Sequence, residues 1–167
     1  PPIMTVRALS ALGKGGRLVT PHLGKRIEYD IGFSKDIEFP EDKQILKPET
    51  SEEITRMLVR VVDEALLGGT VSLDNYSIAA KTGTAQIASP DGGYYDDRYL
   101  HSFFGYFPAY KPKFIVFLMT IEPVGVRYAS QTLTLPFMDI TKFLINYYDV
   151  PPDRGMDLEV MEKMKGV

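Results

Sequence analysis

Residues 81–86 combine one cation, two hydroxyl groups and a glycine at the end of a strand-like run, in the order Lys-Thr-Gly-Thr-Ala-Gln. The preceding residues 76–80 alternate and branch as strands do. A glycine within such a run indicates that another backbone or a ligand approaches closely. A strand edge with open N–H groups, two hydroxyls and an ammonium suits an anionic ligand that contains amide bonds. We therefore predict a binding site formed by Lys81, Thr82, Gly83 and Thr84.

This hexapeptide is similar to the third active-site motif of penicillin-binding proteins and serine β-lactamases, whose partner motifs are Ser-x-x-Lys and Ser-Asp-Asn. The similarity extends along the chain. Residues 92–95 and 102–109 resemble the loop and next strand of class B, septal-type penicillin-binding proteins, and residues 111–123 resemble the turn and last strand of their sheet. Residues 4–22 resemble the helix and turn that precede the motif. The resemblance covers roughly residues 1–152, in the family's order.

Two departures from the family pattern accompany this resemblance. Ala80 stands where the family commonly has glycine, and residues 128–134 stand where it has a turn of small residues. No serine is followed three residues later by lysine, and no Ser-x-Asn occurs. The resemblance places the chain after both of those motifs. We therefore expect residues 1–152 to be the C-terminal part of a D,D-transpeptidase domain, and residues 153–167 to be a polar tail, either a short helix or disordered.

The resemblance implies a role for each residue of the motif. Lys81 points into the cleft, supports proton transfer at the serine of the missing Ser-x-Asn motif and attracts the substrate carboxylate. The hydroxyls of Thr82 and Thr84 bind the carboxylate of a β-lactam or a stem peptide. The Thr84 N–H is one of two oxyanion donors, and Gly83 lets the substrate backbone approach. This chemistry needs no cofactor and no metal.

Strict alternation complicates these roles, because it puts Lys81 and Gly83 on one face of the strand and Thr82 and Thr84 on the other. We expect the strand to be the edge that lines the cleft, so that both sets of groups reach around it; a local twist is the alternative. Five neighbouring polar residues either shape the cleft mouth or pack in the fold. They are Gln86, Tyr95, Tyr99, His101 and Ser102. We do not assign His101 as a catalytic base.

The elements that must position this motif follow from periodicity. Strands are predicted at about 76–87, 100–107 and 114–122, with a hairpin-length connection that implies antiparallel pairing. The third strand is apolar almost throughout, as expected when helices cover both faces. Helices are predicted at 51–67 and 136–148, both packed on the sheet. The fold class is α/β (α+β), an antiparallel sheet flanked by helices, and the resemblance implies a partial β-lactamase/transpeptidase-like fold.

Local signals set the ends of these helices. Pro2 fits the first turn of an N-terminal helix that ends at Gly13 and Gly15-Gly16. Thr50 and Glu53 form a capping box before the helix at 51–67. Pro136 marks the start of the last helix or a kink in it.

Composition excludes several classes of protein. With 167 residues and 44% hydrophobic content, the chain can bury a real core. A net charge of −3 with mixed signs argues against nucleic-acid binding. The absence of cysteine excludes disulfides and thiolate metal sites, and two distant histidines make a metal site improbable. No run approaches the length of a membrane span.

The resemblance also sets the expected partners and location. They are peptidoglycan stem peptides and β-lactams, the N-terminal remainder of the domain, and proteins of the division or elongation machinery. The parent protein is expected outside the cytoplasmic membrane, in the periplasm or on the outer face, anchored by a segment absent here.

Two functions of different class remain open. The first is a fragment of a class B transpeptidase, an enzyme of cell-wall synthesis and division that is inactive without its missing motifs. The second is a non-catalytic module on the same fold that binds a peptide or a partner protein, with a β-lactam sensor as a variant of the first.

Overall fold

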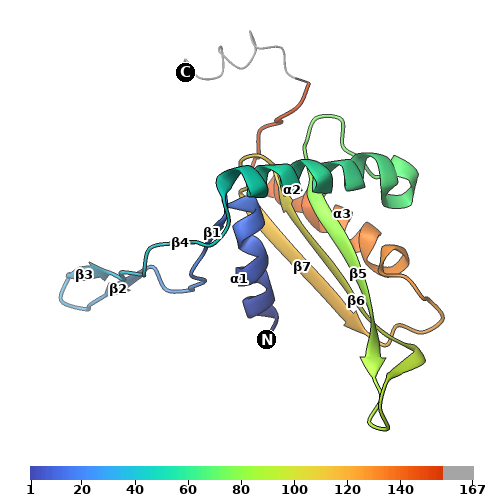
Figure 1. Ribbon diagram of the computed structural model, residues 1–167. Helices are drawn as coiled ribbons and strands as arrows, with labels where there is room; N and C mark the ends of the chain where they lie inside the picture. Colours follow the sequence, from blue (N-terminus) through green and yellow to red (C-terminus); the bar gives the residue numbers. More distant parts are fainter. Residues whose placement is uncertain (156–167) are drawn as a thin grey trace. The chain divides into compact units, whose positions relative to one another are not determined.

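The computed structural model describes residues 1–155, which divide into two compact units, Pro1–Glu53 and a second unit that begins at Ile54 (Figure 1). The end of the predicted tail, residues 156–167, lies outside the described residues. Among residues 1–155, no helix has the length and apolar character that a bilayer crossing requires.

The first unit begins with helix α1, Pro2–Gly13, whose proline lies in the first turn as predicted. The chain then turns through Gly15 and Gly16, both at positive φ, which confirms the predicted helix end. Short strands follow in two antiparallel pairs, Arg17–Leu18 (β1) with Lys43–Gln44 (β4), and Arg26–Glu28 (β2) with Ser34–Asp36 (β3).

Helix α2, Pro48–Arg60, crosses from the first unit into the second. It starts two positions before the predicted cap, so the capping box at Thr50 was wrong. The Ser51 N–H already donates to the carbonyl of Lys47 at 3.1 Å, which makes Lys47 the first helical acceptor. Pro48 favours this earlier start because its fixed φ suits the first helical position. The helix continues as a π-turn, Val61–Ala65 (η1), and a 3₁₀ turn, Leu66–Gly69 (η2).

The second unit is built on the three-stranded antiparallel sheet that the sequence predicts. Its strands are Ala79–Ala88 (β5), Tyr94–Phe107 (β6) and Phe114–Ile121 (β7), in the order β5-β6-β7 (Figure 1). The β5–β6 register breaks between Gln86 and Ala88, whereas β6–β7 pairing runs without a break. β5 and β7 are therefore the two edges of the sheet.

Helix α3 spans Ala129–Tyr147, so the predicted start at residue 136 was wrong. The buried residues Ala129, Leu133 and Phe137 are spaced by four and form one continuous stripe, which the proline interrupts in sequence but not in space. Pro136 removes one backbone donor without ending the helix. Gln131 caps the true start, since its Oε1 accepts from the Tyr128 N–H at 3.2 Å.

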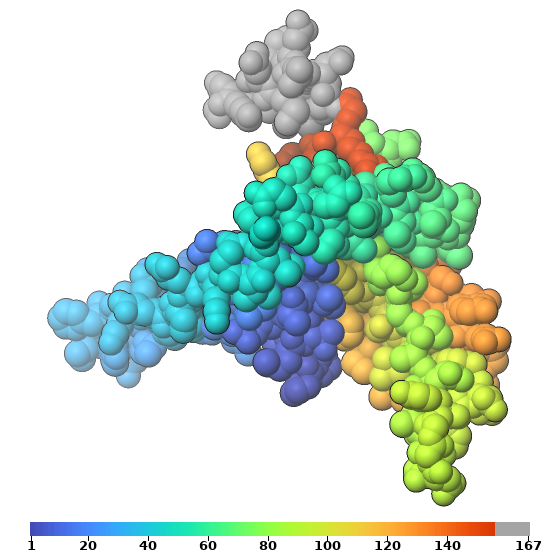
Figure 2. Space-filling model, viewed as in Figure 1, coloured from blue at the N-terminus to red at the C-terminus, as the bar shows by residue number. Residues whose placement is uncertain are grey.

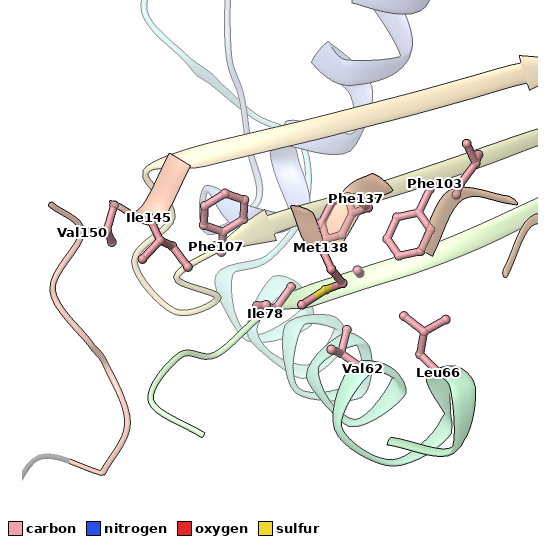
Figure 3. Packing of buried hydrophobic residues seen from close by; sticks show 11 residues of the cluster. Val62, Leu66, Ile78, Phe103, Phe107, Phe137, Met138, Ile145 and Val150 are labelled. Atoms are coloured by element: carbon pink, nitrogen blue, oxygen red, sulfur yellow. The ribbon is translucent and has the colours of Figure 1, made fainter. Parts of the chain in front are cut away.

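The hydrophobic core lies between α3 and one face of the sheet, with α2's continuation at its border (Figure 3). Phe103 of β6 and Phe137 of α3 stack with their ring centroids 4.4 Å apart. Val62 and Leu66 join the same cluster. On the other side, the Tyr106 hydroxyl lies 2.8 Å from the Thr55 hydroxyl of α2. Both predicted helices thus pack on the sheet.

Strand β7 departs from its prediction, because only one of its faces joins this core. Phe114, Val116 and Leu118 pack against the cluster. Met119 and Ile121, which point to the opposite face, are 40% and 61% exposed. The strand carries no charged residue and no proline between residues 114 and 121.

The last described residues form hydrogen bonds with the segment that leads into β5. The Asp153 carboxylate accepts from the Ser77 N–H at 2.7 Å and from the Ser77 hydroxyl. Arg154 forms a two-pronged ion pair with Asp63, at 3.0 and 2.6 Å. The strand that carries the motif is therefore held at its N-terminal end by residues far along the chain.

Candidate functional site

The open edge of β5 is defined by the hydrogen bonding of the sheet. The Glu122 N–H donates to the Tyr99 carbonyl at 2.8 Å, so the backbone of Tyr99 faces β7. Alternation then turns the backbone groups of Ser102 and Phe104 toward β5. Their partners in the register are Gly83 and Lys81. These two motif residues therefore hold the sheet together through their backbone.

The backbone N–H and C=O of Thr82 and Thr84 point the other way, off the edge of the sheet. No strand pairs with this edge among residues 1–155. The Lys81 ammonium confirms the direction, because its Nζ donates to the Thr82 carbonyl at 2.8 Å. The ammonium thus lies at the same edge as the outward N–H groups. In the space-filling view, the segment from β5 into the β5–β6 turn forms part of the surface (Figure 2).

The Thr84 hydroxyl lies on the face of the sheet that α3 covers. Its Oγ1 accepts from the backbone N–H of Ala129, the first residue of α3, at 3.0 Å. One lone pair of the hydroxyl is therefore occupied, and its proton is left to be donated elsewhere. The positive end of the α3 dipole lies beside it. Thr82 is half-buried on the same face, opposite Phe103.

The strand is an edge of the sheet, as predicted, with Lys81 and Gly83 on one face and Thr82 and Thr84 on the other. Lys81 starts on the face opposite to α3 and curls to the edge, while Thr84 stands on the α3 face. Both are exposed. The edge therefore gathers one cation and two outward N–H groups, with the Thr84 hydroxyl beside them on the α3 face. Such a set binds carboxylates and stabilises a developing oxyanion. Ligand binding itself stays a prediction.

The absence of a side chain at Gly83 is explained by a neighbour within the chain itself. A Cβ at this position would lie 2.5 Å from the hydroxyl oxygen of Ser102 on β6. The close neighbour is thus a side chain across the sheet. Ser102 packs against the motif strand on the face that Lys81 starts from.

The other neighbouring polar residues make contacts within the fold. Gln86 Nε2 donates to the Tyr95 carbonyl at 3.1 Å, and the Tyr99 hydroxyl donates to the Asp96 carbonyl at 2.6 Å. The Arg98 guanidinium lies over the Tyr95 ring, 4.3 Å from its centroid. These contacts shape the β5–β6 hairpin.

Sequence reasoning missed the Ala129 N–H, which touches the motif more directly than any of these side chains. Almost every residue has a backbone N–H, so the residue type does not single this donor out. The predicted helix start at 136 also left Ala129 outside the helix. A pocket of about 350 Å³ lies elsewhere, at residues 72–76 and the C-terminal half of α3, and none of the four motif residues lines it.

Comparison with known proteins bears on most of the chain. Residues 2–140 match the family model described as the penicillin binding protein transpeptidase domain. Stage V sporulation protein D of Bacillus subtilis is 33% identical over 140 residues, which cover 82% of this chain and 21% of that protein. The probable peptidoglycan D,D-transpeptidase PenA of Neisseria meningitidis is 29% identical over 127 residues, 75% of this chain and 22% of that protein.

A solved structure agrees with the fold. Penicillin-binding protein 3 of Mycobacterium tuberculosis, in complex with ampicillin, superposes with a TM-score of 0.76 at 26% identity, covering 90% of this chain and 35% of that one. The chain thus spans about a fifth of the two curated relatives and about a third of the solved structure.

Proposed function

Because the chain belongs to the family of penicillin-binding protein transpeptidase domains, we propose that it forms one wall of a serine D,D-transpeptidase site that cross-links peptidoglycan stem peptides. One observation carries the proposal: the edge of β5 presents the Lys81 ammonium beside the outward backbone of Thr82 and Thr84. The names of the relatives and the ampicillin complex of the similar structure support it.

Each motif residue has a chemical task in this proposal. The hydroxyls of Thr82 and Thr84 and the Lys81 ammonium bind the carboxylate of a stem peptide or a β-lactam. The Thr84 N–H donates to the oxyanion that forms when a serine attacks the carbonyl. Lys81 also supports proton transfer at the facing serine. Gly83, which carries no side chain, lets the acyl donor lie along the strand.

The remaining groups come from outside this chain. Acyl transfer needs an activated serine, and no Ser-x-x-Lys or Ser-x-Asn occurs among the 167 residues. We propose that the rest of the transpeptidase domain supplies both motifs and is the chain's first partner. The parent protein then acts outside the cytoplasmic membrane, held by an anchor on another segment, together with division or elongation proteins.

The first test is incubation of the isolated chain with a fluorescent penicillin, followed by denaturing electrophoresis and intact-mass measurement. We expect no covalent adduct, because half an oxyanion hole and a carboxylate clamp cannot form an ester. A stoichiometric adduct would reveal an unrecognised nucleophile and would contradict the assigned roles.

The second test joins the chain to a polypeptide that bears the two missing motifs. Labelling should appear, and Lys81→Ala or Thr84→Val should reduce its rate by about 10²-fold, as for loss of an electrostatic contact in an acyl-transfer site. Matched controls are Lys111→Ala and Thr70→Val, exposed residues outside the motif. If the joined protein folds but is never labelled, while stem-peptide analogues still bind reversibly, the non-catalytic peptide-binding function is the correct one.

A further inference from the structure

His101 is a fully buried imidazole that the proposed function does not use. It lies on β6 with 0% of its surface exposed, directly opposite Thr84 in the register. A buried polar ring is costly unless both nitrogens have partners. The partners here are specific and both lie at the beginning of α3.

The two ring nitrogens hold the two sides of the α3 N-terminus. Nε2 lies 2.9 Å from the carbonyl of Arg127, two residues before the helix. Because a carbonyl only accepts, Nε2 must carry a proton. Nδ1 lies 2.9 Å from the Thr132 hydroxyl, in the first turn. That hydroxyl also lies 3.3 Å from the carbonyl of Ala129, so it donates to one of these two acceptors.

Ala129 lies between these two attachment points, and its N–H donates to the Thr84 hydroxyl at 3.0 Å. The cross-strand pair Thr84–His101 therefore makes three polar contacts with residues 127–132. Two involve the ring nitrogens of His101 and one involves the Thr84 hydroxyl. The position of the Ala129 N–H, and with it the orientation of the Thr84 hydroxyl, depends on where the imidazole holds the helix.

We propose that His101 is a positioning residue: it holds the first turn of α3 so that the Ala129 N–H occupies one lone pair of the Thr84 hydroxyl and directs its proton to the open edge of β5. The catalytic consequence rests on the proposed function, since the acceptor of that proton is the carboxylate of the acyl donor. Nothing in this arrangement requires His101 to touch the ligand.

The size of the effect follows from the freedom of the threonine side chain. Without the Ala129 contact, χ1 of Thr84 can sample up to three staggered wells, which lowers the productive fraction about threefold. Moving the positive end of α3 away from the edge weakens the anion site further, so the total loss in acylation rate should be about three- to tenfold.

The structural part of the proposal is tested by NMR on the chain itself. Two readouts report the network: exchange of the Ala129 amide and the χ1 couplings of Thr84. His101→Leu removes both contacts, and Thr132→Val removes one of them in a milder way. His101→Gln returns a donor that can reach the Arg127 carbonyl. Thr141→Val is the matched control, since its buried hydroxyl has no hydrogen-bond partner in the described part of the chain.

We expect His101→Leu to accelerate Ala129 exchange about tenfold, which corresponds to the loss of roughly one hydrogen bond, and to average the Thr84 couplings. Thr132→Val should do the same to a smaller extent, His101→Gln should return both readouts toward the wild-type values, and Thr141→Val should change neither. Unchanged exchange and couplings in folded His101→Leu, or in Thr132→Val if the leucine variant does not fold, would overturn the proposal.

The catalytic part is tested by penicillin acylation of the chain joined to the missing motifs. A three- to tenfold slower rate in His101→Leu, restored in His101→Gln, supports positioning. An unchanged rate despite a disturbed Ala129–Thr84 contact overturns it, while leaving the proposed function intact. If the joined wild-type protein is not acylated at all, the proposed function fails, and the NMR readouts still decide whether His101 sets the Thr84 hydroxyl.

Discussion

Adding one methyl group at Gly105 or at Gly83 gives a paired test of how the two faces of the sheet are packed. A Cβ at Gly105 would meet Phe137 Cζ at 2.5 Å, the Ala80 Cβ at 2.8 Å and the Ala79 carbonyl oxygen at 3.0 Å. The site is buried between β6 and α3, so none of these atoms can move without disturbing the core. A Cβ at Gly83 would clash only with the Ser102 hydroxyl, at 2.5 Å, and that hydroxyl can rotate about one bond.

The magnitude follows from these contacts. Overpacking a core lowers the free energy of unfolding by about 1–3 kcal/mol. Replacing glycine by alanine at an unstrained position raises it by about 0.4–1 kcal/mol, because the unfolded chain has less conformational entropy. Gly105→Ala should therefore lower the free energy of unfolding by about 1–2 kcal/mol. Gly83→Ala should change it by no more than about 0.5 kcal/mol, because Ser102 gives up only a long contact of 3.5 Å to the Gly83 carbonyl.

Urea unfolding of both variants, followed by circular dichroism, measures this difference. The double variant Gly105→Ala with Phe137→Leu should recover part of the loss caused by overpacking, measured against Phe137→Leu alone. Adding Ser102→Ala to Gly83→Ala should show almost no coupling. An equal loss of stability at the two glycines, or a larger loss at Gly83, would refute this reasoning. It requires that α3 packs tightly on its face of the sheet and that the opposite face has room at Gly83.

Two further predictions concern polar contacts. Tyr106→Phe should lower the free energy of unfolding by about 1 kcal/mol, because it removes the contact with the Thr55 hydroxyl. Burial raises the pKa of the Tyr106 phenol above its ordinary value of 10.0, against the Thr55 hydrogen bond, which lowers it. Wild-type stability should thus fall as the pH rises from about 10 toward the folded pKa, and less so in the variant; urea unfolding between pH 8 and 11 checks both. Asp63→Asn should cost about 1 kcal/mol by weakening the partly buried pair with Arg154, whereas Glu64→Gln in an exposed pair should leave the urea midpoint unmoved.

The sheet could be predicted because its signals are local. Strand periodicity and the short connection between Phe107 and Phe114 determine an antiparallel hairpin, and the motif strand follows from alternation before Lys81. The two helices that cover the sheet have apolar residues at helical spacing. In each case the residues that determine the element are close together in the sequence, so the element can be predicted without knowledge of tertiary contacts.

The errors have a different origin. The start of α3 depends on Ala129 and Leu133 meeting the sheet, a tertiary contact that outweighs the break suggested by Pro136. The role of the Ala129 N–H is invisible in the sequence for the same reason. His101 could be named but not placed, because its two partners lie 26 and 31 residues away. The sequence also could not show that only one face of β7 joins the hydrophobic core.

The two edges of the sheet differ in how readily a strand of another polypeptide can pair with them. β5 carries Lys81 and a break in register at Gln86, two features that discourage a foreign strand from pairing along its whole length. β7 has neither, and its backbone groups at residues 115, 117, 119 and 121 face away from β6 along a strand without charge or proline. In a concentrated solution, association should therefore begin at β7, by templated strand addition. The motif edge would remain accessible within such assemblies.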